Sequence, residues 1–220
     1  MKKNFWFYEG KEVSKEGSFF KRIRNKFFEG KKGISQSIIG REIFNKYIKK
    51  NPENLKLLDI GGAGGHQYDL IPIKDKTRID IDEDKLKESI GWKTKLIEAE
   101  KLDFKEEFDL VSCFQLLEHT KNPLKIMNNI YKSLKKGGKV WITVPDLEAV
   151  GFKFYDYYTH IFPFTKKRIL FMIKSCGFKV EIIKKYTTPK YWYLFYFFPK
   201  LLLKYMLLFK KGSLLLIARK

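Results

Sequence analysis

The sequence has few of the residues that build a disulfide framework or a zinc site. Its 220 residues include two cysteines, Cys113 and Cys176, which are far apart and outside any CxxC pattern, and three scattered histidines. These features exclude a disulfide scaffold and a cysteine-rich zinc site, and they are typical of a reducing compartment. A signal-peptide apolar segment is also missing, because Glu9 and Lys11 interrupt the start. We therefore expect a cytoplasmic protein without a bound metal.

Acidic residues are scarce at both ends of the sequence. The formal net charge is +20, and residues 151–220 carry 15 basic but only 2 acidic side chains. Residues 1–50 carry 14 basic and 5 acidic side chains, whereas residues 51–150 are nearly balanced, with 16 basic and 18 acidic side chains. Basic flanks attract nucleic acid, an anionic membrane surface or a phosphorylated substrate, or they simply keep a surface soluble. The 44% of hydrophobic residues suffices for one sizeable core and excludes global disorder.

Hydrophobic periodicity predicts strands that alternate with helices. The expected strands are 55–60, a segment ending at 78–82, 95–98, 108–113, 139–144, 178–183 and 213–218. The expected helices are 34–50, 84–90, one opened by Asn122-Pro123 and ended by Lys136-Gly137-Gly138, and one from Thr165 to Ser175. This alternation is typical of a doubly wound, mostly parallel sheet with helices on both faces.

A cluster of glycines directly follows the first expected strand. Residues 61–65 read Gly-Gly-Ala-Gly-Gly, and such a loop lets a ligand approach the backbone closely. The G-x-G-x-x-G dinucleotide pattern fails in both registers, and no Gly-Lys-Ser/Thr of a phosphate loop follows. Asp59 precedes the glycines and Asp80 ends the second strand. Asp80 lies 19 residues after Gly61, and in doubly wound sheets an acid at about this separation from the glycines binds ribose hydroxyls.

These residues, with later segments in the same order, resemble the class I S-adenosylmethionine-dependent methyltransferases. Six segments carry the resemblance: 57–65, 79–82, 97–104, 108–111, 115–119 and 134–138. The resemblance covers about Leu55 to Pro145, and it continues more weakly to Lys220. Two positions depart from the family pattern. Ala63 stands where the middle glycine usually lies, and Glu98 stands where aspartate is commoner.

The resemblance implies S-adenosylmethionine as the cofactor and a role for each matching residue. Asp59 would orient the glycine loop. The methionine part would be lined by Gly61, Ala63 and Gly65. Asp80 would hold the ribose, and the adenine would lie between Ile81 on one side and Glu98 and Ala99 at its edge. Phe114 and Gln115 would face the methionine or the substrate.

The histidines are the candidate proton acceptors. Methyl transfer is an in-line displacement in which the protein mainly aligns the nucleophile, and a base is needed only if the nucleophile must lose a proton. His119 follows the fourth expected strand and is the first candidate base; alternatively it pairs with Glu118 or a backbone group and shapes the loop. His160 follows the fifth strand amid aromatic residues, where it either lines the acceptor pocket or packs.

An aromatic insertion lies between the last two expected strands. Of the 19 residues in 191–209, 16 are apolar, but Pro199, Lys200 and Lys204 interrupt the run and argue against a membrane span. Two interpretations stay open. The segment lies in an anionic membrane interface with its lysines toward the headgroups, or it is a lid that buries its apolar residues against the core or in a homodimer.

Together these features predict a single α/β domain with a Rossmann-like, seven-stranded, mostly parallel sheet. Residues 1–50 form a basic helical cap, 51–185 the cofactor-binding core, 186–211 the insertion, and 212–220 the last strand. The predicted function is methyl transfer to a small or amphiphilic acceptor, lipid-linked if the insertion binds the inner face of a membrane, and at oxygen. The alternatives are RNA methylation through the basic flanks and a non-catalytic, membrane-associated module.

Overall fold

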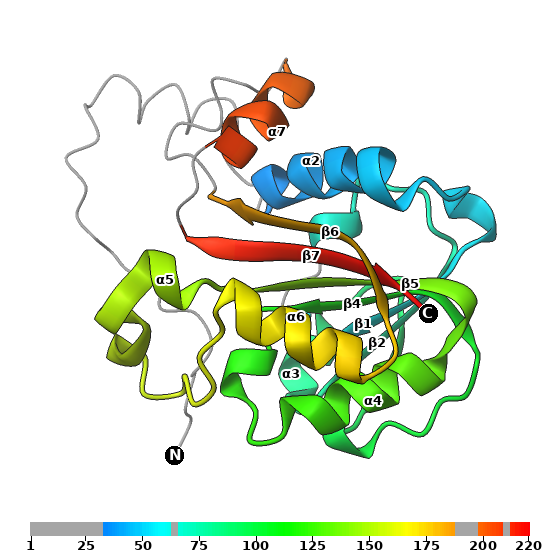
Figure 1. Ribbon diagram of the computed structural model, residues 1–220. Coiled ribbons are helices and arrows are strands. Elements are labelled where there is room, and N and C mark those ends of the chain that lie inside the picture. The colour runs from blue at the N-terminus through cyan, green and yellow to red at the C-terminus, as the bar shows by residue number, and fades with distance from the viewer. Residues whose placement is uncertain (1–32, 63–65, 188–197, 209–211) are drawn as a thin grey trace.

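The protein is built around one seven-stranded sheet. A computed structural model describes residues 33–62, 66–187, 198–208 and 212–220 (Figure 1). The strands are β1 (Lys56–Ile60), β2 (Asp75–Asp80), β3 (Lys93–Leu96), β4 (Phe108–Phe114), β5 (Leu134–Pro145), β6 (Lys179–Tyr186) and β7 (Ser213–Arg219). Their order is β3-β2-β1-β4-β5-β7-β6, with β7 antiparallel to both of its neighbours. The predicted doubly wound, mostly parallel sheet is therefore confirmed.

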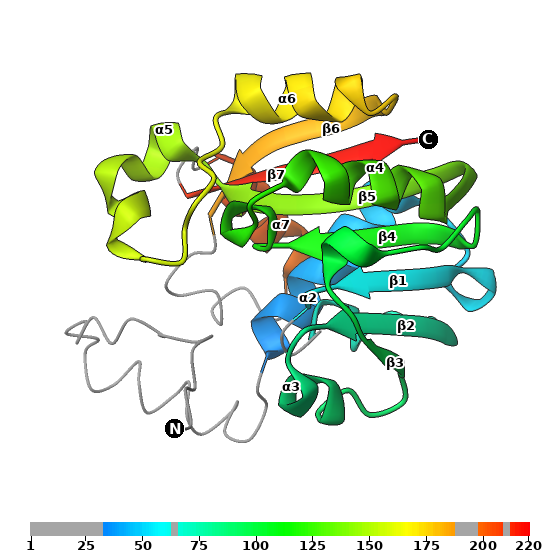
Figure 2. The same cartoon turned by 90° about the horizontal axis from the view of Figure 1, so that it is seen from below.

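Helices cover both faces of this sheet. They are α2 (Ile34–Ile43), α3 (Glu83–Lys87), α4 (Pro123–Ser133), α5 (Leu147–Val150), α6 (Lys166–Ser175) and α7 (Pro199–Leu208). Figure 2 shows α4 and α6 on one face, with α2 and α7 on the other. Each pair of helices packs on its own hydrophobic core. The core under α4 and α6 includes Met127 and Ile173, and the core under α2 and α7 includes Ile38 and Met206.

Side-chain caps fix where several helices begin. Asp82 accepts hydrogen bonds at the start of α3, Asn122 caps α4 and Thr165 caps α6. These caps satisfy backbone N–H groups that have no partner within the helix. Asn122 and Thr165 are short polar residues just before apolar periodic segments, so the beginnings of α4 and α6 follow from the sequence.

The prediction that Lys136-Gly137-Gly138 ends the fourth helix is wrong. Helix α4 already ends at Ser133, and Leu134 adopts an extended conformation that begins β5. Gly137 and Gly138 are hydrogen-bonded to the backbone of Lys220 instead. These glycines therefore belong to β5 and pair with the last residue of the sequence, and they do not end a helix.

The expected helix at 34–50 is also shorter than predicted. Helix α2 ends at Ile43, a π-helical turn continues from Phe44 to Ile48, and Lys49 has a φ of 54°. Helix α2 packs directly on the turn at His66–Tyr68. The approach is so close that a Cβ on Gly40 would lie 2.0 Å from the carbonyl oxygen of Gln67. The N-terminal helix thus covers one side of the edge where β1 ends.

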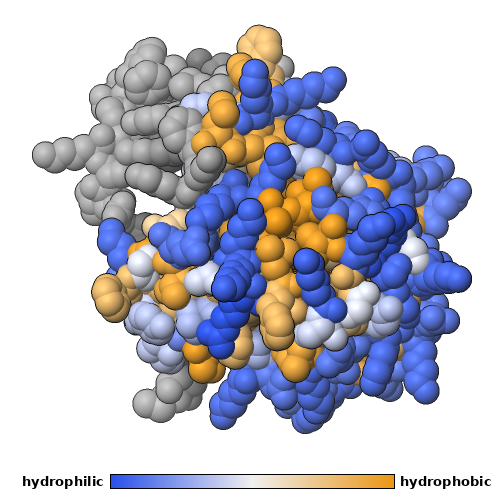
Figure 3. Space-filling view, in the orientation of Figure 1, coloured by the Kyte–Doolittle hydropathy of each residue, from blue (hydrophilic) through white to orange (hydrophobic). Residues whose placement is uncertain are grey.

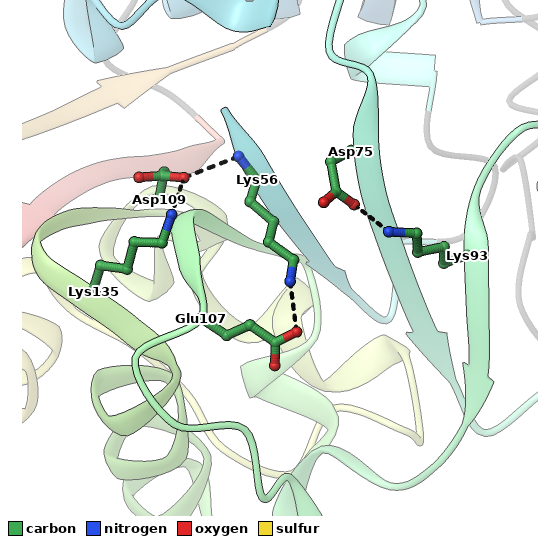
Figure 4. Close-up of polar contacts among 6 residues, drawn as sticks. All are labelled: Lys56, Asp75, Lys93, Glu107, Asp109 and Lys135. Atoms are coloured by element: carbon green, nitrogen blue, oxygen red, sulfur yellow. Dashed lines mark hydrogen bonds and ion pairs between the residues drawn. The ribbon is translucent and has the colours of Figure 1, made fainter. Parts of the chain in front are cut away.

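The amino-terminal edge of the sheet is closed by pairs of lysines and acids (Figure 4). Lys56 donates its Nζ to Glu107 at 2.7 Å and its backbone N–H to Asp109 at 3.0 Å. Lys135 also donates to Asp109, at 2.8 Å, and Lys93 donates to Asp75 at 2.8 Å. Such partly exposed pairs stabilise little individually, and they lie at the opposite edge from the carboxyl ends of the parallel strands.

Part of the aromatic insertion packs on the protein. Helix α7 buries Leu202, Leu203 and Met206 in the core that it shares with α2, whereas Phe198, Leu201 and Leu208 are exposed. Figure 3 shows hydrophobic surface over α7 among hydrophilic side chains. No helix in the described ranges is long and apolar enough to cross a membrane. The rest of the expected insertion, at 191–197 and 209, lies outside the described residues.

Candidate active site

The carboxyl ends of β1, β2 and β4 meet at one edge of the sheet. The backbone N–H of Gly61 donates to Ile79 of β2 at 2.9 Å, and that of Gln115 donates to Thr143 of β5 at 2.8 Å. Gly61 has a φ of 64°, a conformation that favours glycine. In open α/β sheets ligands bind outside the carboxyl ends of the strands, which makes this edge the candidate site.

Asp59 lies beneath the glycine loop and is fully buried. One carboxylate oxygen accepts from Arg78 Nε at 3.1 Å and the other from the Ser112 hydroxyl. Burial raises the pKa of Asp59, while the Arg78 guanidinium opposes the rise. A Cβ on Gly62 would lie 1.8 Å from Asp59 Oδ2. The carboxylate therefore lies directly against Gly62, whereas its role in orienting the glycine loop stays a prediction.

Arg78 is a site residue that the sequence analysis missed. Its Nη1 donates to the Ser89 hydroxyl at 2.8 Å, and its guanidinium stacks 3.9 Å from the centre of the Trp92 ring. Arg78 is 3% exposed, and buried arginines nearly always have an acidic partner. One signal in the sequence could have indicated this pair. Arg78 is a charged residue inside the expected second strand, and Asp59 is an acid inside the expected first strand.

The residues assigned to ribose and adenine come together at the ends of β2 and β3. Asp80 is 8% exposed and accepts from the backbone N–H of Asp82 at 3.0 Å. The next residue, Ile81, is 61% exposed although it is large and apolar. The carbonyl of Asp80 accepts from Ile97 at 3.0 Å, which places the following segment beside it. A carboxylate and an exposed apolar side chain thus adjoin at the end of β2.

Glu98 and Ala99 follow in that neighbouring segment. Ala99 is buried, and Asn129 of α4 donates to the carbonyl of Glu100 at 3.0 Å. The Glu98 carboxylate is exposed and pairs with Lys101 at 3.0 Å. The backbone here is held firmly, whereas the Glu98 side chain is bound only by a surface lysine. Two further assigned residues, Ala63 and Gly65, lie outside the described residues.

A cavity of about 250 Å³ opens beside the end of β4. The described residues that line it are Gln36, Ile39, Gly40, Ile43, Gln67, Phe114, Gln115, Trp141, Thr143, Tyr186, Thr187, Gly212 and Ser213. None of these side chains is an acid or a base at neutral pH, since burial raises the pKa of Tyr186 to about 12. The described part of the lining therefore suits a neutral molecule with an apolar body.

Gln115 connects the cavity to the sheet edge. Its φ of 47° is unusual for a residue with a side chain, and its Nε2 donates to the Thr143 hydroxyl at 3.1 Å. Phe114 stacks edge-on against Trp141, with ring centres 4.9 Å apart. Phe114 and Gln115 therefore both line the cavity at the end of β4, and the expectation that they face the methionine or the substrate stays a prediction.

Two histidines that the sequence analysis treated as scattered lie side by side. The ring centres of His119 and His160 are 4.8 Å apart. His119 Nδ1 lies 3.1 Å from the carbonyl of Thr159, and His160 Nδ1 lies 2.8 Å from the carbonyl of Phe154. A carbonyl only accepts, so each Nδ1 carries the proton and each Nε2 carries the lone pair. Burial lowers the pKa of both rings, which favours their neutral form.

Glu118 lies beneath the two histidines and is fully buried. Its backbone carbonyl accepts from Ile161 and Phe162, at 2.8 and 2.9 Å, so the turn after β4 is tied to the segment that carries His160. Its Oε1 is 4.0 Å from His119 Nε2, and burial raises the pKa of Glu118 to about 8. His119 thus contacts both groups that the sequence analysis weighed against a catalytic role, a backbone carbonyl and Glu118.

Comparison with known proteins identifies the kind of chain that carries this site. Residues 36–182 match the family model described as "Methyltransferase domain". An uncharacterised protein of Methanocaldococcus jannaschii is 30% identical over 165 residues, which is 70% of this chain and 77% of that one. A ubiquinone biosynthesis O-methyltransferase of Pseudomonas putida is 28% identical over 100 residues, 40% of this chain but only 43% of that enzyme's length.

Solved structures share the fold over most of the chain. A SAM-dependent methyltransferase from Archaeoglobus fulgidus has a TM-score of 0.63 at 19% identity, covering 92% of this chain and all (100%) of that one. A putative methyltransferase from Bacillus halodurans has a TM-score of 0.62 at 21% identity, and the match covers 82% of this chain and 98% of that one. At these identities the likeness establishes the architecture of the sheet and its helices.

Proposed function

The chain belongs to the methyltransferase domain family, and from this premise we propose that it transfers the methyl group of S-adenosylmethionine to an oxygen of a small, uncharged or amphiphilic acceptor. The observation that carries the proposal is the meeting of the Gly61–Gly62 backbone with Asp80 at one sheet edge. The lack of a Cβ lets the Leu116 side chain pack on Gly61 and the Asp59 carboxylate lie against Gly62, and these contacts hold that backbone beside Asp80.

The residues present fit this cofactor. The Asp80 carboxylate is the group for the two ribose hydroxyls, and the exposed Ile81 offers an apolar surface to the adenine. The backbone at Gly61 and Gly62 borders the methionine part. When bound, the cofactor supplies an activated methyl group on a sulfonium and the leaving group. What remains for the protein is to align the acceptor oxygen and to exclude water.

The cavity beside Gln115 is the proposed acceptor site. Its apolar walls include Ile39, Phe114 and Trp141, and its polar groups are amides and hydroxyls. Such a lining selects a neutral molecule with a flat or aliphatic body and a hydroxyl group. The name of the Pseudomonas putida relative, an O-methyltransferase, supports oxygen as the acceptor atom. The lining does not favour RNA, whose phosphates call for basic side chains.

The acceptor hydroxyl must lose its proton during transfer. The Nε2 atoms of His119 and His160 carry lone pairs, since both Nδ1 atoms face carbonyls. A neutral imidazole is a suitable proton acceptor near pH 7. Neither histidine lines the cavity, but His119 lies in the turn that follows Gln115. We therefore assign the proton to this pair, in the metal-free protein, for an acceptor whose hydroxyl reaches from the cavity to that turn.

The first experiment measures thermal unfolding with and without S-adenosylhomocysteine, the demethylated form of the cofactor. At 100 times the dissociation constant, binding adds about 2.7 kcal/mol, which raises the melting temperature by roughly 5–10 °C for a chain of this size. Asp80→Ala should abolish the rise. The matched control is Asp75→Ala, at the opposite end of β2, where the carboxylate pairs with Lys93 among the described residues. A folded protein with no rise at millimolar ligand would refute the proposal.

A further inference from the structure

We propose that Glu118, His119 and His160 form a binding site for a first-row divalent metal ion of the zinc type. One ring nitrogen of each histidine and one carboxylate oxygen of Glu118 all lie within 4.8 Å of one another. The three residues come from two segments that follow different strands, β4 and β5. Two imidazoles and one carboxylate on one side of an open position are a recurrent ligand set for such ions.

The histidines are already oriented as ligands. Each Nδ1 is directed at a backbone carbonyl, of Thr159 for His119 and of Phe154 for His160. These bonds fix the tautomer and leave the lone pair on Nε2. Metal-bound histidines almost always show this arrangement, in which the second nitrogen donates to a carbonyl or a carboxylate. The backbone thus supplies the outer support of a metal site.

The Glu118 carboxylate is an independent observation that points to a cation. The residue is 0% exposed, and neither carboxylate oxygen has a hydrogen-bond partner among the described residues. Burying a carboxylate without partners costs free energy, and buried acids are normally paired or bound to a metal. Its backbone carbonyl holds Ile161 and Phe162, so the side chain is brought to the histidines by the fold itself.

The spacing requires only a small closure around an ion. Glu118 Oε1 and His119 Nε2 are 4.0 Å apart. Ligands around a tetrahedral zinc ion, at about 2.1 Å from the metal, lie about 3.4 Å from each other. Side-chain rotations that move each ligand atom by less than about 1 Å bring the three atoms to that separation. Imidazole nitrogens favour zinc, copper, iron or nickel over magnesium and calcium, which prefer oxygen ligands.

Three protein ligands leave a coordination position for a further oxygen. The turn that carries Glu118 follows directly on Gln115, which lines the cavity. An acceptor hydroxyl bound at this position would lose its proton more readily, because a bound divalent ion lowers the pKa of a coordinated hydroxyl. This part of the inference rests on the proposed function, whereas binding of the ion does not. With the ion bound, the two Nε2 atoms are ligands and no longer proton acceptors.

The test is zinc binding by the full chain after treatment with a chelator. Equilibrium dialysis against Zn²⁺, with metal analysis, should give one ion per chain that an excess of Mg²⁺ does not displace. His160→Ala and Glu118→Gln should each weaken binding by more than the about 10- to 100-fold that loss of an outer-shell partner costs. The matched control is His66→Ala, because His66 pairs with Asp69 outside the cluster.

Cobalt binding gives a second readout, since Co²⁺ held by nitrogen ligands in a tetrahedral site absorbs visible light. The spectrum should be present in the wild type and in His66→Ala, and absent in His160→Ala. Absence of stoichiometric zinc, or equal losses in His66→Ala and His160→Ala, would overturn the metal site. The thermal shift with S-adenosylhomocysteine should persist in His160→Ala, so failure of the metal site and failure of the proposed methyl transfer are distinguishable.

Discussion

Asp59 and Arg78 are register partners on the parallel strands β1 and β2, and both side chains are buried. Arg78 Nε donates to one oxygen of Asp59 at 3.1 Å, and Ser112 of β4 donates to the other. One carboxylate therefore joins the three strands whose ends form the candidate site. It also lies against Gly62, so the position of this glycine depends on the buried ion pair.

Removing the arginine should destabilise the protein strongly. Arg78→Met leaves the Asp59 carboxylate buried without its cation, and such a loss costs about 3–5 kcal/mol. The measurement is urea unfolding at pH 7. The matched control is Lys93→Met, which breaks the partly exposed pair with Asp75 and should cost less than about 1 kcal/mol. Equal losses in the two variants would show that the buried pair has no special role.

Gly62→Ala should disrupt the loop and weaken cofactor binding. The new Cβ would lie 1.8 Å from Asp59 Oδ2, so either the loop or the carboxylate must move. The measurements are the melting temperature and its rise with S-adenosylhomocysteine. Gly91→Ala is the comparison, because Gly91 has a φ of 77° but nothing within 4 Å of the added Cβ. It should cost about 1–2 kcal/mol and leave the ligand-induced rise intact. A normal rise in Gly62→Ala would contradict this account of the loop.

The fold was predictable because its signals are local. Alternating strands and helices, the caps at Asp82, Asn122 and Thr165, and the acids beside the glycines are all visible in the sequence. The end of α4 was not predictable, since Gly137 and Gly138 bond to Lys220 at the other end of the chain. Where a non-local partner competes with a local signal, a single sequence gives no warning.

The candidate site was predictable only in part, for the same reason. The acids and glycines matched a family pattern, whereas the pairing of Asp59 with Arg78 depends on strand register. The meeting of His119 with His160 depends on the path of a loop: hydrogen bonds to the carbonyl of Glu118 bring the segment after β5 back to the turn after β4. No periodicity encodes that path.

The exposed apolar residues of α7, with Phe198 just before it, test whether the aromatic insertion binds membranes. Phe198, Leu201 and Leu208 are 64%, 51% and 65% exposed, beside the exposed lysines 200 and 204. We expect the full chain to sediment with anionic liposomes at low salt, and the triple serine variant to sediment less. Leu124→Ser, at an exposed position on α4, should behave as wild type. Equal sedimentation of all three proteins, or none, would leave α7 with the role of a lid.

The buried side of α7 gives a complementary prediction. Met206 is 0% exposed in the core shared with α2. Met206→Ala should cost about 2–5 kcal/mol in urea unfolding, as loss of a buried large side chain usually does. Leu201→Ala, on the exposed side, is the matched control and should change stability by less than about 0.5 kcal/mol. If both variants were neutral, α7 would not be packed on α2 in solution.

Filling the cavity should separate acceptor binding from cofactor binding. Gln36 is an exposed residue of α2 that lines the cavity, so a larger side chain there enters the space without disturbing the core. Gln36→Trp should lower the transfer of labelled methyl groups into a cellular extract of neutral small molecules and lipids, whereas Gln36→Ala should not. The rise in melting temperature with S-adenosylhomocysteine should be the same in both variants, because Asp80 and the glycine loop are untouched. If Gln36→Trp retained full transfer, the acceptor would bind elsewhere along the sheet edge, and the uncharged lining of this cavity would lose its bearing on the acceptor's chemistry.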